Sequence, residues 1–161
     1  TSKMFIVGKP SVKALKICNV ARDSMMLGIE KVKPGIHLGE IGKVIGAYVH
    51  SKNCSVVRDY CGHGIGEVFH ELPQVIHYDD GKIAQSPVLE PGMTFTIEPM
   101  INLGKRQISV DKDGWTIRTI DRKASAHFEH TVGVTAAGPK ALTTFAYIEE
   151  VLKTSTVLLN I

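Results

Sequence analysis

The stretch YCGHGIGEVFHELPQVIHY, residues 60–78, is the part of the chain around which we expect the fold to be built. It places His63 between two glycines and His70 three residues ahead of a proline. Glycine lets the backbone bend tightly and lets other groups approach closely, and imidazole is the commonest metal-binding side chain. The stretch therefore suits a metal or substrate site, although from these residues alone a glycine-rich turn with incidental histidines is an equal alternative.

The composition around this stretch is that of an ordinary globular protein. The 161 residues are 43% hydrophobic and 22% charged, which predicts one domain over residues 1–161 with a sizeable core. The net charge is only +3, and the 19 Lys and Arg residues are scattered along the chain. We therefore expect no DNA partner, because nucleic-acid binders concentrate their basic residues on one face.

Cysteine usage and hydropathy bear on location. Cys18, Cys54 and Cys61 form an odd set without a CxxC pair, which favours a reducing compartment, and we expect the cytoplasm. No apolar run is long enough to span a bilayer, so we expect no membrane partner.

The chain opens directly on a strand-like run, Met4–Val7, without an initiator methionine. Such a start is typical of an interior cut, and it predicts an open strand edge whose partner lies outside the chain.

A helical hairpin is expected next. Ser11 is a plausible N-cap, and apolar residues recur at helical spacing from Val12 to about Val32. A second helix is predicted from Leu38 to His50 after the breaker at residues 33–35. Within the first helix we interpret Met25 and Met26 as core packing.

The remainder of the chain is predicted to form mainly strands. Short β-branched or alternating runs, separated by turn residues, predict strands at Cys54–Arg58, Met93–Met100, Gln107–Val110, Trp115–Ile120 and Ala126–Thr135. The third and fourth of these form a hairpin around residues 111–114. A short helix is expected within Thr144–Ile161. Helices followed by an antiparallel run of strands give an α+β fold.

Three side chains on separate strands could act together. His63, Glu98 and Glu129 offer one imidazole and two carboxylates, a donor set that suits Mn, Fe, Co or Zn. Apolar neighbours such as Phe95 and Phe128 make these carboxylates costly to bury without a cation. Solvated carboxylates on an exposed sheet face are the alternative that spacing alone leaves open.

Five motifs in order, CGHGIG, FHExPQVxHY, PGMTFTIEPM, KDGWT and EHT, resemble the type I methionine aminopeptidases over nearly all of residues 1–142. The resemblance implies an antiparallel, curved pita-bread fold and removal of the initiator methionine from nascent proteins by two divalent metal ions. Those nascent chains would be its partners, with the ribosome as a further candidate.

The same resemblance implies individual roles. His63, Glu98 and Glu129 would be metal ligands, with Glu129 bridging the two ions and Glu98 also relaying a proton to the leaving amine. His70 would contact the substrate and its scissile carbonyl. Phe69 and Trp115 would wall the methionine pocket. Thr96, on the strand face of Glu98, would support the metal ligands.

Two departures from the family qualify this expectation. In the family, two Asp ligands and a further substrate-binding His precede the segment resembling the start of this chain. The chain is thus expected to be the C-terminal portion of an incomplete pita-bread domain, to bind one metal ion weakly or none, and to turn over no substrate alone. Residues 143–161 form an atypical tail without a counterpart in the family.

The sequence alone leaves two other functions open. The chain could be a non-catalytic folded fragment or subunit that pairs with a separate N-terminal chain through the open edge at Met4–Val7. It could also be a proline-type pita-bread dipeptidase, which shares the same metal chemistry. The segment Cys61–Gly66 together with Lys112–Trp115 favours the methionine enzyme.

Overall fold

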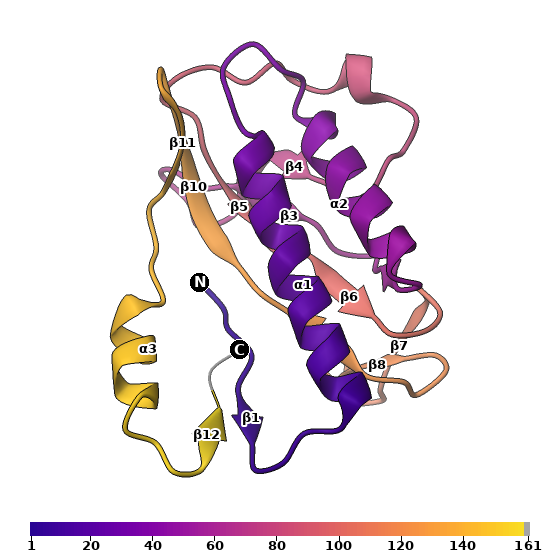
Figure 1. Ribbon diagram of the computed structural model, residues 1–161. Coiled ribbons are helices and arrows are strands. Elements are labelled where there is room, and N and C mark those ends of the chain that lie inside the picture. The colour runs from indigo at the N-terminus through magenta and orange to yellow at the C-terminus, as the bar shows by residue number, and fades with distance from the viewer. Residues whose placement is uncertain (160–161) are drawn as a thin grey trace.

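The predicted helical hairpin is confirmed in the computed structural model, which describes residues 1–159 (Figure 1). Helix α1 spans Val12–Lys31, and the hydroxyl of Ser11 accepts a 3.1 Å hydrogen bond from the Ala14 N–H at its start. Helix α2 spans Gly39–Ser51. Figure 1 shows α1 crossing the strands with α2 beside it. None of the helices in residues 1–159 combines the length and apolarity that a bilayer crossing requires.

Antiparallel pairing builds all the sheets of the described chain. The largest has the order β11-β10-β5-β3-β4, and a second has the order β2-β6-β9. Two-stranded pairs, β7-β8 and β1-β12, complete the set. The strand bounds are β1 Ile6–Val7, β2 Ser55–Val56, β3 Gly62–Gly64, β4 Glu71–Val75, β5 Thr94–Ile97, β6 Met100–Asn102, β7 Ile108–Val110, β8 Ile117–Thr119, β9 Ser125–His127, β10 His130–Thr135, β11 Gly138–Ala141 and β12 Leu158–Leu159. The predicted α+β class is confirmed, as is the hairpin β7-β8.

The core lies between the helical hairpin and the two larger sheets. Met25 of α1 and Ile45 of α2 are fully buried, and they belong to the same apolar cluster as Phe95 and Ile97 of β5. Burying each such side chain contributes roughly 1.5–3 kcal/mol, so this contact holds the helices against β5, the strand that directly precedes Glu98. The interpretation of Met26 as a core residue is wrong, because its side chain is 42% exposed on α1.

The run expected as one strand, residues 126–135, is divided between two sheets. β9 pairs with β6, whereas β10 pairs with β5 and β11, and Phe128 and Glu129 form the crossing point. Phe128 is fully buried there. An apolar anchor at a strand crossing keeps the next side chain, Glu129, at a defined position between the sheets.

The first strand does not have the open edge that the sequence suggested. Ile6 pairs with Leu159 and Val7 with Leu158, and the Gly8 N–H donates a 3.0 Å hydrogen bond to the Val157 carbonyl. The tail therefore contains a helix, α3 at Ala146–Leu152, followed by a strand that covers β1. The prediction of a short helix in the tail is confirmed, and the expectation of an unpaired edge is wrong.

Close backbone packing explains the glycines that flank His63. A Cβ atom on Gly62 would overlap the Thr96 carbonyl oxygen of β5, and one on Gly64 would overlap the Leu72 carbonyl oxygen of β4. Strand β3 is therefore held between its two neighbours at a separation that no other residue permits. The two glycines fix the position of His63.

Gly62→Ala should destabilise the protein by roughly 1–3 kcal/mol, because the sheet must open locally to admit the methyl group. Gly133→Ala is the matched control, since its Cβ would make an ordinary 3.5 Å contact with Leu142 and alanine is the better strand residue. Urea unfolding of both variants measures the difference. Equal stability of Gly62→Ala and the unchanged chain would contradict the packing that places His63.

Candidate metal centre

His63 is oriented by its own backbone. Its Nδ1 lies 2.9 Å from the Gly64 carbonyl oxygen, and because a carbonyl only accepts hydrogen bonds, Nδ1 carries the proton. In the neutral imidazole the lone pair is then on Nε2, which lies 3.4 Å from Oε1 of Glu98. A histidine with Nδ1–H bound to a carbonyl and Nε2 free has the tautomer that binds a metal ion.

Glu98 follows directly after β5 and is the centre of the polar contacts. Its Oε1 accepts a 2.7 Å hydrogen bond from the Thr96 hydroxyl, and Thr96 also accepts a 2.9 Å hydrogen bond from the His63 N–H. Burial raises the pKa of Glu98, but the neighbouring His127 imidazole and the Thr96 hydroxyl outweigh burial, and the pKa lies below its usual value. Glu98 is therefore a carboxylate at neutral pH, and Thr96 supports both predicted ligands.

Two histidines to which the sequence analysis assigned no role also contact Glu98, and one of them, His77, belongs to the motif FHExPQVxHY. The Glu98 N–H donates a 3.2 Å hydrogen bond to Nε2 of His77, whose burial lowers its pKa to about 4. Nε2 of His127 lies 3.7 Å from Oε2 of Glu98 and, although buried, has no hydrogen-bond partner among the described residues. Strand periodicity was the available signal for His127, because residues 127 and 129 project to the same side of an extended chain.

Glu129 lies next to this group without a direct contact to it. Its backbone pairs with Ser2, and its side chain is 18% exposed, with the Thr1 amino group 3.7 Å from Oε2. His130 pairs with Ile97 in the β10-β5 ladder, so Glu129 and Glu98 are the next residues beyond that pair on each strand. Two carboxylates in such positions repel one another unless a cation compensates them.

The predicted substrate residues are only partly brought together. The rings of His70 and His63 lie 4.3 Å apart between centroids, and the ring of Phe69 lies 4.6 Å from that of His70. Trp115 is 86% exposed in the turn between β7 and β8, where its backbone N–H donates a 2.9 Å hydrogen bond to the Asp113 carboxylate. No ring contact joins Trp115 to the other aromatic residues within residues 1–159.

The donor chemistry suits a divalent cation, but the described residues do not form a complete cage. His63 presents an imidazole lone pair, Glu98 an ionised carboxylate, and Glu129 a second carboxylate nearby. These donors fit Mn, Fe, Co or Zn. Within residues 1–159, however, no three His, Cys, Asp or Glu side chains are grouped so that they could hold a metal ion together.

Comparison with known families gives a match over residues 1–136, to the model of metallopeptidase family M24. Over 143 residues the chain is 54% identical to a methionine aminopeptidase of Escherichia coli, covering 89% of this chain and 53% of that relative. It is 53% identical over 143 residues to one from Buchnera aphidicola, with the same coverage. The chain spans about half the length of these relatives.

Solved structures agree with this grouping. The methionine aminopeptidase of Rickettsia prowazekii superposes with a TM-score of 0.84 at 46% identity, covering 88% of this chain and 57% of that chain. The prolidase of Pyrococcus horikoshii superposes with a TM-score of 0.63 at 27% identity, covering 86% and 34%. The predicted pita-bread fold is thereby confirmed.

Proposed function

Because the chain belongs to metallopeptidase family M24, we propose that it carries one side of a metal-dependent active site that removes methionine from the N-termini of nascent proteins. The observation that supports this proposal most directly is that His63 Nε2 lies 3.4 Å from Glu98 Oε1, while the Nδ1–H of His63 donates a hydrogen bond to the Gly64 carbonyl oxygen. Such activity places the protein in the cytoplasm, and an association with the ribosome is a further prediction of the same proposal.

His63, Glu98 and Glu129 would hold the metal ions, of which we propose two in the complete site, Glu129 being the bridging ligand. When bound, divalent ions would polarise the scissile carbonyl and lower the pKa of the attacking water. The chain's own residues supply the proton chemistry. Glu98 is ionised, so it can accept a proton from that water and pass it to the leaving amine.

His70 and Phe69 would act on the substrate. The exposed imidazole of His70 lies beside His63 and would donate a hydrogen bond to the carbonyl oxygen as negative charge develops, a contribution of roughly 3 kcal/mol. Phe69, 68% exposed against His70, would form one wall of an apolar pocket for the methionine side chain. The exposed indole of Trp115 is available as a second wall.

The two other functions receive less support. The edge of β1 that would recruit a separate subunit is already paired with β12. A proline-type dipeptidase is disfavoured because the chain is more similar to the Rickettsia methionine aminopeptidase, at 46% identity, than to the Pyrococcus prolidase, at 27%.

A chimera tests the proposed function. This chain would replace the matching part of the E. coli methionine aminopeptidase, so that the remainder of that relative supplies the other half of the domain. We expect the chimera to release methionine from Met-Gly-Met in the presence of Mn²⁺ or Co²⁺ and to reject Leu-Gly-Met and Ala-Pro. The isolated chain should release none, because its described residues do not form a complete metal cage. The proposal is overturned if a folded, metal-loaded chimera releases no methionine from Met-Gly-Met, or if it cleaves Ala-Pro in preference.

A further inference from the structure

A groove with a cavity volume of about 440 Å³ lies beside α2, and none of the residues proposed for metal or substrate binding lines it. One wall is the last half of α2, and the other includes the segment around β2. Buried Val49, Cys54 and Val56 form an apolar floor. A cavity of this volume above an apolar floor has room for a small molecule.

The rim of this groove is strongly cationic. Lys43, Arg58 and Arg106 line it together with His50, whereas Asp79 is the single carboxylate in the lining. Within residues 1–159, Lys43, Arg58 and Arg106 make no ion pair with any carboxylate. Unneutralised cations around a depression with an apolar floor concentrate the positive potential inside it and attract anions.

Two further features favour an anion in this groove. The Arg58 guanidinium is held 4.4 Å from the centroid of the Tyr78 ring, which leaves its planar fork oriented and ready for phosphate oxygens. The negative end of α2, which would repel an anion, is already capped: the carbonyls of Tyr48, Val49 and His50 accept hydrogen bonds from residues 52–54.

We propose that this groove is a binding site for a nucleoside polyphosphate. The cavity falls in the range of about 300–1,000 Å³ that small-ligand sites occupy. The three cations match a polyphosphate, and the apolar floor beside Tyr78 matches the planar base. The groove shares no residue with the proposed metal centre, so nucleotide binding can be tested independently of the proposed peptidase activity.

Calorimetric titration of the metal-free chain with ATP, in EDTA, tests the proposal. We expect saturable binding that weakens at least about tenfold in the double variant Arg58→Gln and Lys43→Gln, and that weakens as salt is raised. Ala47→Glu, on the exposed face of α2 that lines the groove, keeps every cation and should abolish binding by charge repulsion. Pyrophosphate and adenosine, titrated separately, should each bind more weakly than ATP.

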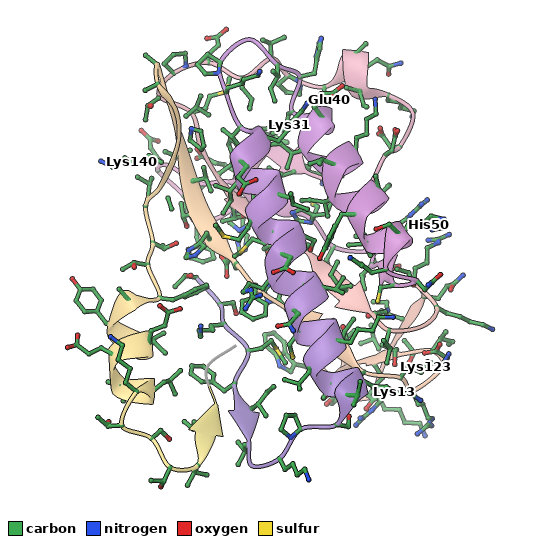
Figure 2. The ribbon with its side chains drawn as sticks, viewed as in Figure 1. Lys13, Lys31, Glu40, His50, Lys123 and Lys140 are labelled. Atoms are coloured by element: carbon green, nitrogen blue, oxygen red, sulfur yellow. The ribbon has the colours of Figure 1, made fainter. Side chains whose placement is uncertain are left out.

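Lys140→Gln is the matched control, because it removes one positive charge from β11, on the opposite side of the molecule from His50 (Figure 2). It should bind ATP like the unchanged chain. The proposal is overturned if ATP does not bind, if pyrophosphate binds as tightly as ATP, or if Lys140→Gln weakens binding as much as the groove variants do. Displacement of ATP by a single-stranded RNA at lower concentration would also overturn it, in favour of a nucleic-acid surface.

Discussion

Replacing Glu98 with glutamine should slow methionine release by the chimera about 10²- to 10⁴-fold, the usual contribution of a positioned proton-transfer group. Glutamine keeps the shape of the side chain and can still accept the 2.7 Å hydrogen bond from Thr96. It has no negative charge to hold a cation and cannot accept the proton of the attacking water. The measurement is the steady-state rate with Met-Gly-Met at saturating Mn²⁺.

The control for this substitution is Glu90→Gln. Glu90 is exposed in the turn before β5, and its change removes the same charge without touching the candidate metal centre. We expect it to leave the rate unchanged. An equal loss of rate in both variants would mean that net charge, rather than the position of Glu98, controls the reaction.

Lowering the pH should reduce the free energy of unfolding by about 3 kcal/mol through His77. This is the energy that corresponds to its lowered pKa, because a difference of one pKa unit between the folded and unfolded states is worth about 1.4 kcal/mol. Burial lowers the pKa of His77 from 6.5 in the unfolded chain to about 4 in the folded one. The unfolded state therefore binds a proton first as the pH falls. The stability from this residue is fully present above pH 6.5, is lost progressively down to about pH 4, and changes no further below that.

His77→Gln should remove most of this dependence, because glutamine can accept the hydrogen bond from the Glu98 N–H without titrating. The comparison to make is the difference in unfolding free energy between pH 7 and pH 4.5, which cancels any constant cost of the substitution. His50→Gln, at an exposed position on α2, is the control and should follow the unchanged chain. A pH dependence that is the same for His77→Gln and the unchanged chain would contradict the buried, neutral imidazole.

Local sequence signals predicted the features that depend on local structure. Helical spacing located α1 and α2, and alternation located β5 and placed Thr96 on the same side as Glu98. The glycines around His63 marked a place where strands approach closely, and their neighbours in the structure explain why.

The remaining features depend on which segments pair, and no local pattern encodes that. Strand β4 was not expected, because its pairing with β3 comes from the fold of the 60–78 stretch rather than from alternation. The break at Phe128 arises because β9 and β10 join different sheets. His77 and His127 contact Glu98 only after β6, β9 and the segment following β4 have come together.

Calorimetric titration of the isolated chain with Mn²⁺ at neutral pH tests most directly whether His63 and Glu98 form one side of a divalent metal site. We expect the unchanged chain to bind at most one ion, weakly, and we expect both His63→Gln and Glu98→Gln to lose that binding while Glu90→Gln keeps it. Tight binding of two ions per chain, or binding that survives both substitutions, would contradict it.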